Sequence, residues 1–289
     1  VGPNILPFIA KNIAPAIEKR VQNNSIQFTN IIACENMIEG STKLKNALLP
    51  LLSPEALVHV EQFIGFPDSA VDRIVPNQKN EDVLWVKVEP FYEWVVDSSK
   101  IKGELTIPGV HFTPDLEAYI ERKLFTVNTG HASIAYCGYL KGYATVYEAI
   151  QDSEVEALVR AVLAETSSLL VVKHGFDIQT QAEYVDKTIK RFKNPSVIDE
   201  VTRVGRGPLR KLSAQDRFFK PMLELHDREM ESSHLQKVVA MALKFNVAED
   251  EESVKLQALI HDKGKQAALA EVSGLAVDHP LILSILKLS

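Results

Sequence analysis

The sequence is poor in cysteine. Its 289 residues contain two, Cys34 and Cys137, which lie about a hundred positions apart. A structural zinc site takes four ligands, and small secreted domains are held together by several disulfides, so the sequence predicts neither. We interpret both cysteines as buried thiols in a reducing compartment, which makes a cytoplasmic location the expectation.

The sequence also lacks long hydrophobic runs and a surplus of positive charge. No apolar run approaches the ~20 residues that a membrane-spanning helix needs. The net charge is −6, whereas phosphate-backbone binding needs a basic face. The first residues lack the basic start of a signal peptide and contain two prolines. We therefore expect no membrane, nucleic-acid or metal partner, and a small molecule as the ligand.

Hydrophobic periodicity changes along the chain. A helix is predicted over residues 4–22, a buried parallel strand over 30–34, helices to 48 and over 53–63, and strands over 66–76 and 83–97. From residue 115 onward the pattern is almost wholly helical. The predicted fold class is α/β plus all-α. Residues 1–105 would form the C-terminal remnant of a Rossmann-type sheet with added strands, and 106–289 a helical substrate domain.

The segment Lys123–His131 combines an amine, an amide and an imidazole at Lys123, Asn128 and His131. On a helix these groups lie about 140° and 80° around the axis from the lysine, so all three can face one cleft. They suit proton removal, oxyanion stabilisation and hydroxyl binding during carbinol oxidation. In the alternative interpretation, Lys123 is solvated, Asn128 and Gly130 end a helix, and His131 caps the next. Apolar flanking residues predict burial, which favours a functional lysine.

Two further polar groups stand out. Glu35 and Asn36 follow the predicted strand over 30–34, at the sheet edge where ligands bind in α/β proteins, although they could equally be loop residues. A basic run covers residues 203–213, and Arg217, just beyond it, is counted with the run. We interpret it as a phosphate site, a solvated turn, or a structural network that pairs with Asp216 or Glu200. The candidate phosphate ligands are Arg206, Arg210, Lys211 and Arg217.

Four motifs carry a family resemblance. They cover residues 33–37 (ACENM), 71–76 (VDRIVP), 121–131 (ERKLFTVNTGH) and 208–213 (PLRKLS). Together they resemble the polyol-specific long-chain dehydrogenase/reductase family, in the same order and over essentially the whole chain. The Lys-x4-Asn-x2-His pattern is the specific part of the resemblance.

The resemblance implies an NAD-binding domain of Rossmann type, a helical substrate domain, and an active site between them. The implied reaction interconverts mannitol 1-phosphate and fructose 6-phosphate. Lys123 would be the general base, Asn36 and Asn128 would form the oxyanion pocket, and His131 would hold a neighbouring hydroxyl. The family mildly favours a monomer, and no metal is implied.

One departure from the family pattern concerns the cofactor. The family opens with a Gly-x-Gly-x-x-Gly-type turn that binds the pyrophosphate, and this sequence has none. It begins, by resemblance, late in the cofactor domain, so we expect a fragment that binds NAD weakly or not at all. The residues expected beside the cofactor are Gly2, Pro3, Glu35 and Asn36.

Two alternative functions remain. A dehydrogenase of an unphosphorylated polyol or hexuronate, similar to mannitol 2-dehydrogenase, would not need the basic run. A non-catalytic helical interaction domain would instead expose a large apolar patch.

Overall fold

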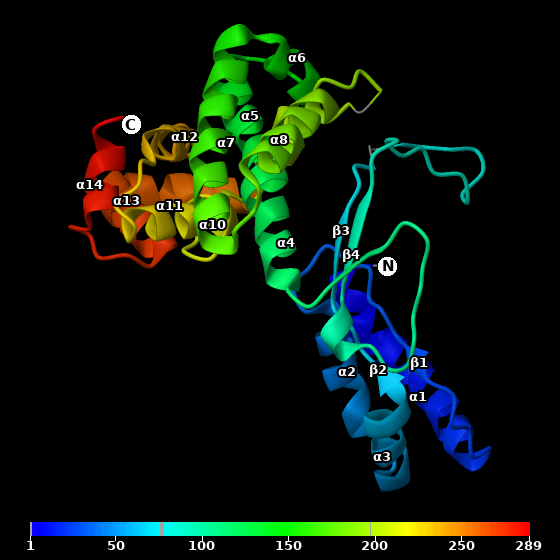
Figure 1. The fold of residues 1–289 in the computed structure, drawn as a ribbon. Coiled ribbons are helices and arrows are strands. Elements are labelled where there is room, and N and C mark those ends of the chain that lie inside the picture. The colour runs from blue at the N-terminus through cyan, green and yellow to red at the C-terminus, as the bar shows by residue number, and fades with distance from the viewer. Residues whose placement is uncertain (1, 76–77, 197) are drawn as a thin grey trace. The chain divides into compact units, whose positions relative to one another are not determined.

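The computed structural model describes residues 2–75, 78–196 and 198–289, and the chain divides into two compact units (Figure 1). The first unit comprises Val1–Arg73 and Pro90–Ile120, and the second comprises Ile74–Glu89 and Glu121–Ser289. The first unit combines helices with small sheets and the second is helical, so the predicted fold class is confirmed. The domain boundary between residues 105 and 106 stays a prediction. Val1, Pro76 and the side chain of Pro3 lie outside the described part of the chain.

The helices of the first unit pack one apolar face each into a common core. In α1 (Leu6–Gln22) the buried stripe is Leu6, Ala10, Ala14 and Ile17. The spacing of the apolar residues predicts a stripe of Ile5, Ile9, Ile13, Ala16 and Ile17. This prediction is confirmed at Ile17 and wrong at Ile5, which is 39% exposed. The other helical elements are η1 (Pro3–Ile5), α2 (Gly40–Leu48), η2 (Leu49–Leu51), α3 (Pro54–Phe63) and η3 (Ser98–Lys100).

Ser53 begins α3 as its sequence position predicts. Its hydroxyl accepts a hydrogen bond from the backbone N–H of Ala56 at 3.2 Å, and Pro54 occupies the first helical position. The hydroxyl satisfies one of the free N–H groups at the helix start, and proline has no N–H to lose there. This cap fixes where α3 begins.

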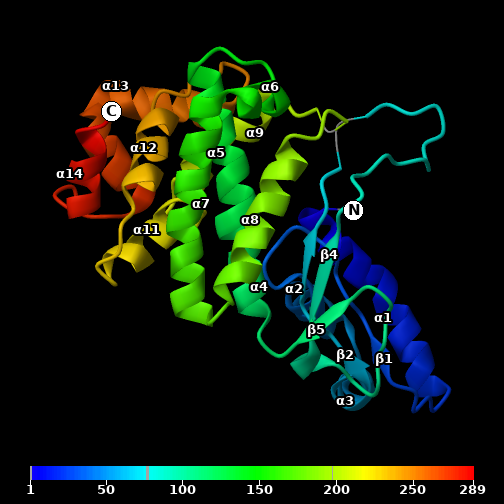
Figure 2. The same cartoon turned by 45° about the horizontal axis from the view of Figure 1, so that its top comes forward.

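Two small sheets lie in the first unit (Figure 2). Strand β1 (Thr29–Asn30) pairs in parallel with β2 (Ile64–Gly65). The other sheet has the order β3 (Ser69–Asp72), β4 (Glu93–Asp97) and β5 (His111–Thr113), with an antiparallel and then a parallel pairing. The parallel pairing predicted for the first strand is confirmed. Its predicted extent, residues 30–34, is wrong, because regular pairing ends at Asn30 and the chain continues as a loop.

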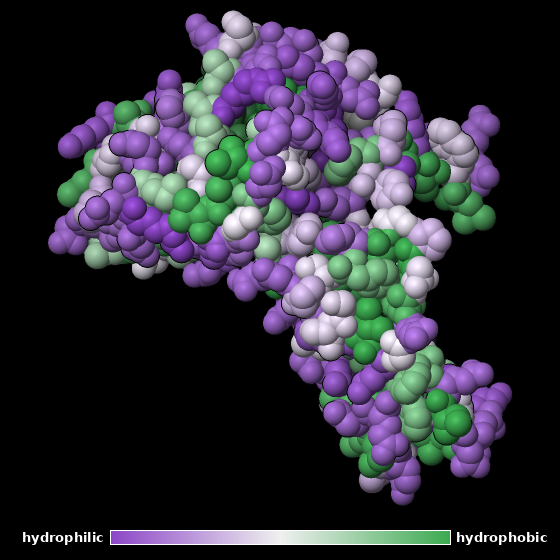
Figure 3. Space-filling view, viewed as in Figure 1, coloured by the Kyte–Doolittle hydropathy of each residue, from purple (hydrophilic) through white to green (hydrophobic). Residues whose placement is uncertain are grey.

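The strand predicted from residue 83 is also wrong at its start, because residues 78–89 form a loop (Figure 1). The side-chain amide of Gln78 donates to the carbonyl of Lys87 and accepts from its N–H, which closes the loop without a backbone ladder. Strand propensity reflects packing against neighbours, and none of the strands in the described residues pairs with this segment. Its tip, Val83–Val86, is 56–89% exposed, and the hydrophobic atoms are visible in Figure 3.

The second unit is built on long helices. Helices α5, α7 and α8 run beside one another in both views (Figures 1 and 2). No helix in the described ranges meets the length and apolarity needed to cross a membrane. The elements from residue 116 onward are α4 (Leu116–Arg122), η4 (Lys123–Asn128), α5 (Thr129–Leu140), α6 (Val146–Gln151), α7 (Ser153–His174), α8 (Ile178–Phe192), α9 (Val201–Gly205), α10 (Pro208–Lys211), α11 (Phe219–His226), α12 (Ser233–Ala242), α13 (Glu251–Ser273) and α14 (Pro280–Leu286).

Candidate active site

The predicted catalytic segment lies on a continuous helical path. Residues Lys123–Asn128 form one π-helical stretch between α4 and α5. The alternative interpretation, a helix that ends at Asn128 or Gly130, is therefore wrong. Gly130 lies inside α5, where an added Cβ would come within 3.2 Å of the Phe192 ring. Short π-helical segments occur frequently at functional sites.

The burial predicted from the apolar flanks is confirmed. Phe125, Thr126 and Val127 are buried, while Lys123 and Asn128 are half-buried. The segment therefore forms part of the core and leaves its polar side chains partly accessible. Lys123 makes interactions of its own in the structure.

His131, one turn further along, is held between a ring and a carboxylate. Its imidazole stacks on Phe192 with ring centroids 5.2 Å apart and planes 19° apart. Its Nε2 lies 3.6 Å from Oδ2 of Asp199. Burial lowers the pKa of His131 to about 4, because loss of water disfavours the cation. Asp199 acts in the opposite direction, and nearby arginines add to the lowering.

The basic run is attached directly to this segment. Nη1 of Arg217 donates to the carbonyl of Asn128 at 3.3 Å, and the hydroxyl of Thr129 donates to the carbonyl of Arg217 at 2.9 Å. The pairing predicted with Asp216 is confirmed, since Asp216 accepts from both Arg210 and Arg217 at 2.7 Å. The run is therefore partly a structural network, and it lies beside the candidate catalytic residues.

Lys211 is the most buried cation of the run, at 5% exposure. Its Nζ donates to the backbone carbonyl of Arg206. Burial, followed by the positive charges of Arg217 and Arg210, lowers the pKa of Lys211 to about 7. A buried amine close to neutrality can gain or lose its charge when an anion binds.

Arg206, in contrast to Lys211, is exposed. It lines a hollow of about 410 Å³ together with Arg203 and the carboxylates Glu200, Glu249 and Asp250. Asp250 also accepts a hydrogen bond from the N–H of Gly207 at 2.9 Å. Of the four predicted phosphate ligands, Arg206 thus has the most acidic environment.

A buried acidic centre that the sequence analysis missed lies two residues before Lys123. Glu121 is 1% exposed and meets Lys173 at 2.8 Å, His174 at 2.6 Å and Lys220 at 2.6 Å. Although burial opposes its charge, hydrogen bonds from Lys173, Lys220 and His174 lower the pKa of Glu121 to about 2. The partners are some fifty to a hundred positions away, so no local pattern indicates the cluster.

The remaining predicted site residues belong to the first unit. Glu35 and Asn36 lie on the loop after β1, where Asn36 is exposed and Glu35 is half-buried. Both carboxylate oxygens of Glu35 accept from the N–H of Gly2 at 3.2 Å. Cys34 on the same loop is exposed, so its predicted burial is wrong, whereas Cys137 is buried as predicted.

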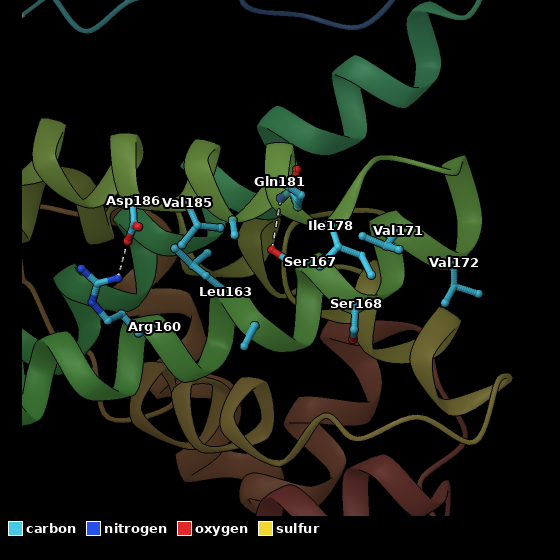
Figure 4. A pocket seen from close by; sticks show the side chains of 12 residues that line it. Arg160, Leu163, Ser167, Ser168, Val171, Val172, Ile178, Gln181, Val185 and Asp186 are labelled. Atoms are coloured by element: carbon cyan, nitrogen blue, oxygen red, sulfur yellow. Dashed lines mark hydrogen bonds and ion pairs between the residues drawn. The ribbon is translucent and has the colours of Figure 1, made fainter.

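An apolar groove in the second unit holds none of the predicted site residues (Figure 4). It lies between α7 and α8 and has a volume of about 500 Å³. Gln181 at its wall donates to Ser167 at 3.1 Å and to Thr126 of the π-helical segment at 3.2 Å. Its hydrophobic lining does not suit a sugar or a phosphate, so the polar cluster around Lys123 to His131 remains the candidate site.

Two solved polyol dehydrogenase structures share this fold. Mannitol 2-dehydrogenase of Pseudomonas fluorescens, in a ternary complex with NAD and D-mannitol, superposes with a TM-score of 0.67 at 23% identity. The match covers 96% of this chain and 65% of that one. A D-sorbitol dehydrogenase in substrate-free form gives a TM-score of 0.72 at 20% identity and covers 94% and 65% of the two chains. This chain thus spans slightly less than two thirds of either structure, and the likeness concerns the fold.

Sequence comparisons give closer relatives. Mannitol-1-phosphate 5-dehydrogenase of Enterococcus faecalis is 50% identical over 276 residues, which cover 95% of this chain and 71% of the relative. The enzyme of the same name from Bacillus subtilis is 48% identical over 288 residues, which cover 99% and 75%. The mannitol dehydrogenase Rossmann domain matches residues 1–109, and the mannitol dehydrogenase C-terminal domain matches residues 115–285. The chain therefore belongs to the mannitol dehydrogenase family.

Proposed function

We propose that this chain carries the catalytic residues of an NAD-dependent oxidoreductase that interconverts mannitol 1-phosphate and fructose 6-phosphate. Relatives of that activity at 46–50% identity support the reaction class. The structural observation that carries the proposal is the attachment of the basic run to the segment Lys123–His131 through Arg217. A single substrate that bears both a reacting hydroxyl and a phosphate would use both groups of residues.

The predicted site residues of the first unit suit the binding of part of a dinucleotide. Ligands of parallel sheets bind beyond the carboxyl ends of the strands, and the loop after β1 brings Glu35 and an exposed Asn36 to that edge. The Glu35 carboxylate also fixes the backbone at Gly2. We assign Gly2, Pro3, Glu35 and Asn36 to the cofactor side. When bound there, NAD supplies the hydride acceptor for alcohol oxidation.

In the proposed mechanism Lys123 takes the proton of the reacting hydroxyl as the carbon–oxygen double bond forms. The side-chain amide of Asn128 donates a hydrogen bond to the oxygen while it carries negative charge. His131, neutral because burial lowers its pKa, holds a neighbouring hydroxyl. In the reverse direction Lys123 returns its proton to the oxygen of the ketose. Positioned acid–base catalysis of this kind contributes typically ~10²–10⁴-fold to the rate.

The phosphate is assigned to the basic run. In fructose 6-phosphate four carbon–carbon bonds separate the carbonyl carbon from the carbon that bears the phosphate. The phosphate therefore has to bind near the catalytic segment but not on it, which is where Lys211 and Arg217 lie. Arg210 and Arg206 are the more exposed members of the set.

The test compares fructose 6-phosphate with fructose as substrates for NADH oxidation by the protein that carries this chain. We expect turnover with the phosphorylated ketose and much weaker turnover with fructose. In Arg210→Ala and Lys211→Ala, the KM for fructose 6-phosphate should rise about tenfold or more, because a hydrogen bond to a charged group contributes about 1.5–3 kcal/mol. The KM for fructose should not change.

Arg160→Ala is the matched control, because Arg160 also forms an ion pair with an aspartate, Asp186, but lies at the apolar groove. It should leave both KM values unchanged. Equal increases in KM for both ketoses in the Arg210 and Lys211 variants would contradict the phosphate assignment and favour an unphosphorylated polyol. Absence of turnover with either ketose would contradict the proposed function.

A further inference from the structure

Asp199 is a buried carboxylate without a role in the proposed mechanism. Its side chain is 3% exposed, and it precedes α9 in the second unit. The backbone carbonyl of Asp199 accepts from the N–H of Val146 at 2.8 Å, and the next residue, Glu200, forms a β-bridge with Thr145. The position of this carboxylate is therefore fixed by backbone contacts on the N-terminal end of α6.

The two oxygens of Asp199 face different partners. Oδ1 pairs with the guanidinium of Arg203, and Oδ2 lies 3.6 Å from Nε2 of His131. The Phe192 ring stacks on the face of the His131 imidazole and restrains the plane of the ring. Asp199 and Phe192 thus define both the plane of the His131 ring and the direction of its Nε2 edge.

We propose that Asp199 is a positioning residue that keeps the proton of neutral His131 on Nε2, so that Nδ1 is the acceptor for the substrate hydroxyl. The proposal rests on the proposed function, which assigns that hydroxyl to His131. The separation of 3.6 Å is longer than a hydrogen bond, and such contacts in ligand-free sites commonly shorten when substrate binds. A carboxylate can only accept, so it favours the tautomer with N–H at the facing nitrogen.

The surrounding charges make this carboxylate necessary. Arg203, Arg217 and Lys211 act on His131 with positive charge, and Asp199 is the acid that opposes them. Without the carboxylate the imidazole would face these cations and lose the acceptor at its Nε2 edge. The selection has to operate on the neutral ring, which is the form present at pH 7 because burial lowers the pKa of His131 to about 4.

The test reads the tautomer by NMR. Ring ¹⁵N chemical shifts are measured at pH 7 in the wild-type chain labelled at histidine, and the His131 signals are assigned by their loss in His131→Gln. We expect the Nε2–H tautomer in the wild type and a mixture of tautomers in Asp199→Asn. Asp186→Asn, at a carboxylate that pairs with Arg160 on the surface, should leave the His131 shifts unchanged.

Two results would overturn the proposal. One is an Nδ1–H tautomer in the wild type, a measurement that needs no variant to fold. The other is an unchanged tautomer in folded Asp199→Asn.

Kinetics gives a separate readout. Asp199→Asn should lower kcat/KM about 10²-fold through misorientation of His131. A wild-type protein that turns over neither ketose would contradict the proposed function. The NMR measurement would still show whether Asp199 sets the tautomer of His131.

Discussion

At the residue scale, the site was predictable where the relevant groups share one short stretch and unpredictable where they do not. Lys123, Asn128 and His131 stand within nine positions, and their apolar neighbours indicated burial. Two buried carboxylates of the same unit, Glu121 and Asp199, could not be assigned from sequence. Most of their partners are distant in sequence, and only the folded chain shows that each carboxylate is buried.

Lys211 gives a pH dependence at this scale. Its pKa falls from 10.5 to about 7 in the folded chain, chiefly through burial. Between pH 7 and 10.5 the unfolded chain binds more protons at Lys211 than the folded chain does. The contribution of Lys211 to the free energy of unfolding therefore rises with pH. Below pH 7 the buried charge carries its full cost. We expect Lys211→Met to raise the free energy of unfolding at pH 6 by on the order of 2 kcal/mol and to remove that rise.

Chemical denaturation at pH 6, 7.5 and 9 measures this difference. Lys255→Met is the matched control: Lys255 is 66% exposed and the variant retains Lys211, so it should keep the rise of stability with pH seen in the wild type. A Lys211→Met variant that is less stable than the wild type at pH 6 and more stable at pH 9 would contradict the assignment.

At the element scale, helices were easier to predict than strands because their periodicity is local. Helix α3 begins at the predicted Ser53 cap, whereas the buried face of α1 includes the predicted Ile17 but not the predicted Ile5. The loop of residues 78–89 has the composition of a strand, but in the described part of the chain it forms individual hydrogen bonds rather than a strand ladder. The π-helical segment Lys123–Asn128 was not predicted, since residue types that suit an α-helix also suit a π-helical turn.

Close packing of α5 against α6 gives a prediction at this scale. An added Cβ at Gly138 would lie 2.7 Å from the Cβ of Ala149, a contact too short to exist without movement of a helix backbone. We expect Gly138→Ala to lower the free energy of unfolding by about 1–3 kcal/mol. The measurement is denaturant unfolding followed by circular dichroism.

The reciprocal variant supplies the control. Ala149→Gly alone should cost about 1 kcal/mol through helix propensity. The double variant Gly138→Ala/Ala149→Gly should lose less free energy of unfolding than the two single variants lose together, because the two methyl groups then no longer meet. Strict additivity would show that the α5–α6 contact is not the cause.

At the scale of the whole molecule, the order of the motifs identified the family before the fold was known. The two units separate the predicted residues: Asn36 belongs to the first, while Lys123, Asn128 and His131 belong to the second with Lys211 and Arg217. The helical character of the second unit and the parallel pairing of β1 followed from the sequence. The pairing of β3, β4 and β5 did not, since strand pairing depends on distant partners.

The most direct test of the account is the turnover number of Lys123→Met with fructose 6-phosphate and NADH. We predict a loss of about 10²–10⁴-fold in kcat, because Lys123 supplies the proton, with a circular dichroism spectrum that shows the native fold. Lys255→Met, an exposed lysine replaced in the same way, should keep full activity. A folded Lys123→Met protein whose kcat stays within about twofold of the wild type would contradict the assignment of the active site.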